Sequence, residues 1–193
     1  MGKALQAELL RLGHRVSGCC SKTVDVRDCA AVKAWADDLG EVDLLLNNAA
    51  LALAPEFLWR VEPEEFARLI ETNLTGVFVV SRAFLPGMLK RGRGVVANFT
   101  SDWGRTASPL YAAYCASKFG VEGLTRALAQ ELPAGVAAVL VDPGDVNTDM
   151  LRLAVGEEAS AAPEAAEWAT RAAPRLLALG PDANGQTVSL TWG

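Results

Sequence analysis

The sequence predicts an α/β protein with a doubly wound parallel sheet. Short apolar segments that suit strands alternate along the chain with segments of helical periodicity. The segment over 42–46 is mostly apolar, as expected for a strand that is covered on both faces, and further strands are predicted over 94–99 and 134–141. The helical segments between them are long enough to serve as crossovers between parallel strands. We expect one domain over residues 1–193.

The first elements are each bounded by residues that start or stop regular structure. Leucines at helical spacing predict a helix over 3–12, which ends at Gly13. Short strands are predicted over 15–20 and 23–26. Asp28 is the expected cap of a helix that ends at Gly40. The remaining predicted elements are a strand over 42–46, a helix over 63–90 opened by Pro63, a strand over 94–99, a helix over 112–132, a strand over 134–141, a helix over 163–179 and a strand over 187–191.

Composition excludes several classes of protein. The 193 residues are 51% hydrophobic, and 18 basic against 23 acidic side chains give a net charge of −5 without a basic block. We therefore expect no nucleic-acid partner. No apolar run approaches the roughly 18 residues of a membrane span, and the first residues lack a signal-peptide pattern, so a cytoplasmic location is predicted. Four cysteines without paired spacing and a single histidine predict no metal site.

Polar residues follow the predicted strands, where ligands of such sheets bind. The strand over 42–46 is followed by Asn47-Asn48, and the next strand is followed by Ser101. Tyr114 and Lys118 lie four residues apart in the following helix and so share one face. An ammonium group close to a phenol favours the phenolate and lowers its pKa, and a serine hydroxyl can hold a substrate oxygen. This combination predicts interconversion of a carbonyl and an alcohol, with the hydride supplied by a nicotinamide cofactor.

Several motifs occur in the order found in one known family. They are Asn47-Asn48-Ala49, Asn73-Leu74-Thr75-Gly76, Ser101, the pair Tyr114-x-x-x-Lys118 and Pro143-Gly144. On these motifs the chain resembles the classical short-chain dehydrogenases/reductases. The resemblance implies a Rossmann-like fold and NAD(P)-dependent hydride transfer.

The resemblance also implies roles for individual residues. Tyr114 matches the general acid/base, and Ser101 matches the residue that orients the substrate oxygen. Lys118 matches the lysine that lowers the tyrosine pKa and holds the nicotinamide ribose. Asn73 matches the asparagine of the proton relay. The residues implied in cofactor binding are Asp25, Val26, Asn48, Ala49, Tyr114, Lys118, Pro143, Gly144, Val146 and Thr148.

The chain departs from the family pattern at its start. The family's first strand and most of its glycine-rich turn are expected to be absent, because Gly2 matches the last glycine of that turn. This departure leaves a second hypothesis open, in which a catalytically impaired, truncated family member acts by association with related subunits. Lys22 stands where family members carry an acidic residue for NAD, which favours NADP over NAD.

Other residues near these motifs leave alternatives open. Tyr111 precedes Tyr114 by three residues and is interpreted as packing or substrate wall. Trp59 and Trp103 either line a substrate pocket or cover the sheet. Arg105 either selects a polar substrate or lies in a solvated loop. The helices over 63–90 and 112–132 carry more apolar residues than one face needs, which predicts a homo-oligomer, such as a dimer, formed through them.

Overall fold

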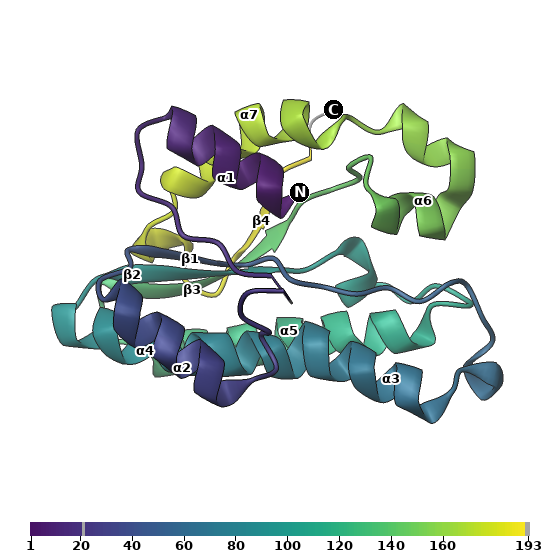
Figure 1. The fold of residues 1–193 in the computed structure, drawn as a ribbon, viewed down its shortest axis with the longest axis horizontal. Coiled ribbons are helices and arrows are strands. Elements are labelled where there is room, and N and C mark those ends of the chain that lie inside the picture. Colours follow the sequence, from purple (N-terminus) through teal and green to yellow (C-terminus); the bar gives the residue numbers. More distant parts are fainter. Residues whose placement is uncertain (21, 192–193) are drawn as a thin grey trace.

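The computed structural model describes residues 1–20 and 22–191, which form one parallel sheet flanked by helices (Figure 1). The strands are β1 (Leu44–Asn47), β2 (Gly94–Phe99), β3 (Val136–Asp142) and β4 (Thr187–Ser189), and they lie in this order across the sheet. All three pairings are parallel, and Leu44 pairs with Val95 while Asn98 pairs with Leu140. The predicted parallel α/β architecture is therefore confirmed.

Helices cover both faces of the sheet (Figure 1). On one face lie α1 (Gly2–Arg11) and α7 (Ala165–Leu177), and on the other lie α2 (Cys29–Leu39), α4 (Gly76–Arg91) and α5 (Ala112–Glu131). The first face is held by a buried cluster in which Leu5 and Trp168 pack with Phe99. The second cluster joins Val32 and Phe84 to strand residues such as Val96. Every residue of β2 and β3 is buried because helices cover both faces of the sheet, whereas Leu44 and Leu46 of β1 are half-buried.

The predicted helix over 63–90 is one continuous helix with an unusual turn in its middle. Pro63 opens α3 (Pro63–Ile70), and a π-helical turn over Glu71–Thr75 leads directly into α4. Asn73 lies in this π-helical turn. Such turns are rare and frequently occur at functional sites.

Two predicted strands, over 15–20 and 23–26, are wrong. Among the described residues of these segments none belongs to a strand, and β1 pairs with β2 alone. The segment around Val16 lines the same cavity as β1 and pairs with no described strand. An extended segment without a neighbour forms no hydrogen-bonded ladder, whatever its β-propensity.

The loops after the strands contain additional short helices that the sequence did not indicate. The helix α6 (Asp149–Val155) follows β3, and its first turn is capped by the hydroxyl of Thr148, which accepts a hydrogen bond from the Leu151 amide. Short 3-10 turns occupy Leu58–Arg60, Asp102–Gly104, Gly156–Ala161 and Pro181–Ala183. In the part of the chain that the structure describes, no helix is both long and apolar enough to cross a membrane.

Candidate active site

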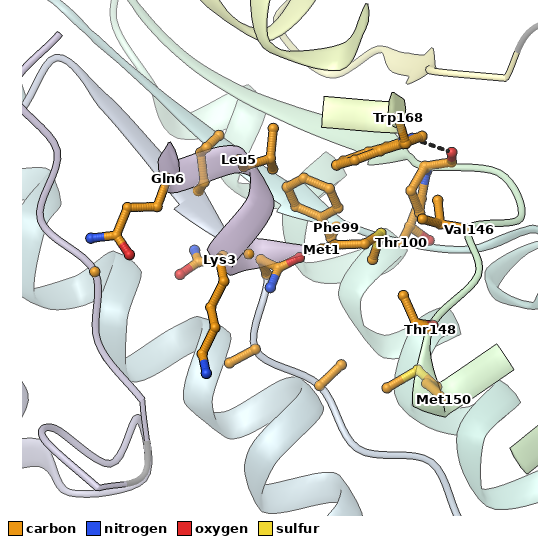
Figure 2. Close-up of a pocket in the computed structure, with 18 of the residues that line it drawn as sticks. Met1, Lys3, Leu5, Gln6, Phe99, Thr100, Val146, Thr148, Met150 and Trp168 are labelled. Carbon is orange, nitrogen blue, oxygen red and sulfur yellow. Dashed lines mark hydrogen bonds between the residues drawn. The ribbon is translucent and has the colours of Figure 1, made fainter. Parts of the chain in front are cut away.

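The loops at the carboxyl ends of β1, β2 and β3 open into one cavity of about 2630 Å³. Figure 2 shows part of it, with Met1 and Leu5 on the side of α1 and Val146 and Thr148 on the loop after β3. The site residues predicted from the sequence that line this cavity are Asp25, Val26, Asn48, Ala49, Ser101, Tyr114, Lys118, Pro143, Gly144, Val146 and Thr148. Residues from distant parts of the sequence thus meet where a parallel sheet presents its ligand site.

Three of these residues form a compact polar group. Tyr114 and Lys118 lie one turn apart on α5, and the Lys118 Nζ atom is 5.6 Å from the centroid of the Tyr114 ring. Ser101 lies two residues beyond β2, near enough to the phenol of Tyr114 for its side chain to lower the pKa of that phenol. The loop beyond it packs closely on α5 because residue 104 is glycine, where a Cβ would lie 3.2 Å from the Lys118 carbonyl oxygen. The predicted serine, tyrosine and lysine are therefore brought together.

The protonation of this group differs from the prediction. Burial raises the pKa of Tyr114 to about 12, and the side chain of Ser101 offsets only part of this rise. Lys118, 3% exposed, has its pKa lowered to about 8, also by burial. The predicted lowering of the Tyr114 pKa by Lys118 is wrong for this structure, because removal from water disfavours both charged forms. Tyr114 holds its proton at neutral pH.

Asn73 lies behind the cavity and supports its wall. It is 1% exposed, and its carboxamide accepts a hydrogen bond from the Leu51 amide at 2.7 Å and donates one to the Leu51 carbonyl oxygen at 2.8 Å. Its Nδ2 atom also lies 3.1 Å from the hydroxyl of Ser117, which in turn donates to the Tyr114 carbonyl oxygen. Asn73 therefore connects the loop after β1 to the turn of α5 that carries Tyr114.

A chain of buried amides fixes the floor of the site. The Asn47 carboxamide donates to Asn98 Oδ1 at 2.8 Å, and Asn98 donates to the hydroxyl of Thr125 on α5 at 2.9 Å. Asn47 and Asn98 are register partners on β1 and β2. Buried side-chain networks of this kind hold one arrangement of the elements that they join. The sequence placed Asn47 at a strand end, but neither Asn98 nor Thr125 was predicted to contribute.

The turn over Pro143-Gly144 is held from three directions. The indole of Trp168 on α7 donates to the Pro143 carbonyl oxygen at 3.0 Å (Figure 2). The carboxylate of Asp142 accepts a hydrogen bond from the Gly144 amide at 3.1 Å, a contact typical of an aspartate that begins a turn. Gly144 has a φ of +66°, and a Cβ there would lie 2.5 Å from Thr191 Cγ2. Trp168 was missed because only its long-range contact reveals its role.

The remaining cofactor candidates come from the segment before α2 and from the loop after β1. The carboxylate of Asp25 is paired with Arg27 at 2.7 Å, and this pairing lowers the Asp25 pKa to about 2. Val26 packs against α4, where a Cβ on Gly76 would lie 2.8 Å from its Cγ2 atom. The Oδ1 atom of Asn48 is buried and, among described residues, lacks a hydrogen-bond partner.

These residues fit a nicotinamide cofactor. A buried carbonyl oxygen without a partner marks a place for a donor from outside the protein. The side chain of Asn48 lies against the backbone at the start of α1, because a Cβ on Gly2 would be only 2.8 Å from Asn48 Nδ2. The amides at the start of a helix favour negatively charged groups such as phosphates. Residues 1–20 and 22–191 contain no group of three or more metal-ligating side chains.

The alternatives left open by the sequence are now decided by position. Trp103 lines the cavity, whereas Trp59 is 77% exposed and lies outside it. Tyr111 stacks on Trp103 with a ring-centroid distance of 4.3 Å, and its hydroxyl donates to the Ala154 carbonyl oxygen. Tyr111 is therefore part of the wall, as interpreted. Arg105 does not line the cavity; it is exposed, as a solvated loop predicts, and its guanidinium is also paired with Glu122 and Asp142.

Comparison with known proteins agrees with this geometry. The family described as short chain dehydrogenase matches residues 2–158. An NADPH-dependent pterin aldehyde reductase of Arabidopsis thaliana is 36% identical over 216 residues, an alignment that covers 98% of this chain and 88% of that protein. The 3-oxoacyl-acyl-carrier-protein reductase FabG of Vibrio cholerae is 38% identical over 68% of this chain, and the aligned part is 54% of that protein.

Solved structures give the same result. A gluconate 5-dehydrogenase from Burkholderia cenocepacia, in complex with NADP and tartrate, superimposes with a TM-score of 0.76 at 28% identity, over 86% of this chain and 71% of that one. A serine dehydrogenase complexed with NADP+ has a TM-score of 0.83 at 24% identity, covering 97% and 89% of the two chains, and shares the Rossmann-like fold. The chain therefore belongs to the short-chain dehydrogenase/reductase family of oxidoreductases.

Proposed function

We propose that this chain is an NADP-dependent reductase that converts an aldehyde or ketone to an alcohol, with Tyr114 as the general acid. The observation that carries this proposal is the meeting of Ser101, Tyr114 and Lys118 in one cavity with the turn at Pro143-Gly144. Tyr114 is a phenol at neutral pH, because burial raises its pKa to about 12, so it carries the proton that a reduction places on the substrate oxygen.

In the reduction, the proton of the Tyr114 hydroxyl passes to the carbonyl oxygen of the substrate. The hydroxyl of Ser101 donates a hydrogen bond to the same oxygen and orients it. Lys118 supplies positive charge beside the phenolate that forms, and Asn73 keeps the Leu51 loop and α5 in place. When bound, the reduced nicotinamide supplies the hydride that the carbonyl carbon accepts.

Two observations support NADPH in preference to NADH. Lys3 and Arg15 line the cavity and can balance the additional phosphate of NADPH. The Arabidopsis relative that aligns with almost the whole chain is an NADPH-dependent enzyme by its name. We assign Asp25, Val26, Asn48 and Ala49 to the adenosine side of the site, together with Pro143, Gly144, Val146 and Thr148 on the nicotinamide side.

The wall beside Tyr114 favours a carbonyl group carried by a flat aromatic ring. Trp103 lies with its ring centroid 6.0 Å from that of Tyr114, and Tyr111 stacks on Trp103. Aromatic walls bind planar rings by stacking. The pterin aldehyde that names the Arabidopsis relative is of this type, and we propose an aromatic or heteroaromatic aldehyde as the preferred substrate class.

Association is a second proposed property. Phe78 on α4 is 50% exposed and Phe119 on α5 is 47% exposed, and we propose that these helices form a homodimer. The same surface supports the alternative function, a catalytically impaired chain that acts by pairing with related subunits.

The four cysteines are free thiols, which supports a reducing compartment such as the cytoplasm.

The test is a thermal melt of the purified chain with saturating NADPH or NADH, followed by assay of NADPH oxidation with aromatic and aliphatic aldehydes. A ligand at 100 times its Kd raises the free energy of unfolding by about 2.7 kcal/mol. We expect a larger upward shift with NADPH and oxidation that depends on the aldehyde. A stable dimer without cofactor binding or turnover would instead favour the association function, and a monomer would contradict it.

A further inference from the structure

Arg105 lies between two carboxylates that are almost fully withdrawn from solvent. Its Nη1 atom is 3.2 Å from Glu122 Oε1, and its Nη2 atom makes a hydrogen bond with Asp142 Oδ2. The Glu122 side chain is 7% exposed and that of Asp142 11%, whereas the Arg105 side chain is 33% exposed. One guanidinium therefore pairs with two carboxylates that belong to different elements. Planar guanidinium groups are suited to such paired contacts.

The two carboxylates each hold part of the proposed site. Glu122 lies on α5, two turns beyond Tyr114, and its Oε1 atom accepts a hydrogen bond from Thr100, the residue before Ser101. Asp142 ends β3 and accepts the hydrogen bond from the Gly144 amide. Arg105 itself follows the loop that contains Ser101. Arg105 also lies 3.8 Å from Asp102 in its own loop, and its ion pairs with Glu122 and Asp142 join that loop to the tyrosine helix and to the turn at Pro143-Gly144.

We infer that Arg105 is a positioning residue, which sets the turn at Pro143-Gly144 relative to Ser101 and Tyr114. This inference rests on the proposed function, because that turn is assigned to the nicotinamide side of the site. Without the guanidinium, two carboxylates of low exposure lose a shared counter-charge, and a structure relaxes to return such groups to water. The relaxation moves the Asp142 carboxylate and, with it, the Gly144 amide that it holds.

Arg126, which lies on α5 with Glu122, provides a matched control. Arg126 pairs with the other oxygen of Glu122, at 2.7 Å, and its side chain is 52% exposed. Substitution of Arg126 removes one ion pair from Glu122 but leaves the contact with Asp142 intact. A comparison of Arg105→Gln with Arg126→Gln therefore separates a loss of charge near Glu122 from a loss of the link to the Pro143-Gly144 turn.

The experiment measures the KM for NADPH, kcat and the melting temperature of four variants: Arg105→Gln, Arg105→Lys, Arg126→Gln and the double variant Arg105→Gln/Asp142→Asn. We expect Arg105→Gln to raise the KM for NADPH and to lower kcat/KM by about 10- to 100-fold, since a displacement of about 1 Å costs about 100-fold. Arg105→Lys should recover part of the loss. The double variant should be no worse than Arg105→Gln, because both changes break the same link.

A purely structural role predicts a different result. Well below the melting temperature of each variant almost every molecule is folded, so a loss of stability alone leaves the KM for NADPH measured there unchanged. A KM for NADPH in Arg105→Gln equal to that of Arg126→Gln would therefore overturn the inference while the proposed function stands.

Hydrogen exchange keeps the two proposals distinguishable. If the parent chain neither binds NADPH nor turns over an aldehyde, the proposed function fails. The link is then judged by exchange of the backbone amides over 100–106 and 142–148 in the same variants. Faster exchange in both segments with Arg105→Gln, but not with Arg126→Gln, supports the inference. Equal exchange in the two variants would refute it.

Discussion

The ammonium group of Lys118 lies 5.6 Å from the centre of the Tyr114 ring and donates its hydrogen bond, at 2.9 Å, to the carbonyl oxygen of Phe99. Phe99 is the last residue of β2, so this bond anchors α5 to the strand that leads to Ser101. The lysine is thereby held beside the phenol in an apolar setting. Burial therefore favours the neutral form of each group, the phenol of Tyr114 and the amine of Lys118, more strongly than water does.

The burial of Lys118 predicts a pH dependence of stability. Its pKa is lowered from 10.5 to about 8, so between these pH values the unfolded chain holds a proton that the folded chain has released. The free energy of unfolding should therefore rise with pH in this window, by at most about 1.4 kcal/mol per pH unit. Lys118→Met should remove this rise, as measured by urea denaturation of both proteins. An equal rise in both would contradict the assignment.

Gly144 is expected to be the least replaceable glycine of the site. Gly144→Ala places a Cβ 2.5 Å from Thr191 Cγ2 and also puts alanine at a φ of +66°. Gly40 has the same φ with no atom within 4 Å, so Gly40→Ala measures the backbone cost alone, about 1 to 3 kcal/mol. Gly144→Ala should destabilise the protein further and reduce the melting shift caused by NADPH. Equal denaturation midpoints for the two variants would exclude the steric argument.

Substrate selection should depend on Trp103. Removal of its ring by Trp103→Ala takes away the aromatic wall next to Tyr114, which should lower kcat/KM for aromatic aldehydes by about 10-fold relative to aliphatic ones. Trp59→Ala is the matched control, since Trp59 is 77% exposed and stacks only on Phe57 among the aromatic rings described. The ratio of the two kcat/KM values is the measured quantity. A ratio unchanged in Trp103→Ala would show that the substrate does not contact this ring.

Much of the fold could be predicted because it depends on local pattern. The strands β2 and β3 follow from short apolar runs, and α5 follows from its length and periodicity. The segment over 15–20 has the same kind of apolar pattern, yet it forms no strand in this structure. Strand formation needs a partner, and no local pattern states whether the neighbouring position in the sheet is filled.

Site residues could be predicted where their sequence spacing alone brings them together. They could not be predicted where their role depends on a partner that is distant in the sequence. Tyr114 and Lys118 are linked by helical spacing alone. Arg105 meets Asp142 across 37 positions of sequence, and Trp168 meets Pro143 across 25, so neither pairing leaves a mark in the local sequence. The Tyr114 pKa was also mispredicted, because burial depends on the surrounding layers and not on the neighbouring lysine alone.

The central claim is that Tyr114 donates the proton in a carbonyl reduction. The most direct measurement compares aldehyde-dependent NADPH oxidation by the parent chain, Tyr114→Phe and Tyr111→Phe. Tyr114→Phe should lower kcat by about 100- to 10,000-fold while the melting temperature and its shift with NADPH persist, since only one hydroxyl is lost. Tyr111→Phe should retain most of the turnover. Undiminished kcat in Tyr114→Phe would contradict the account.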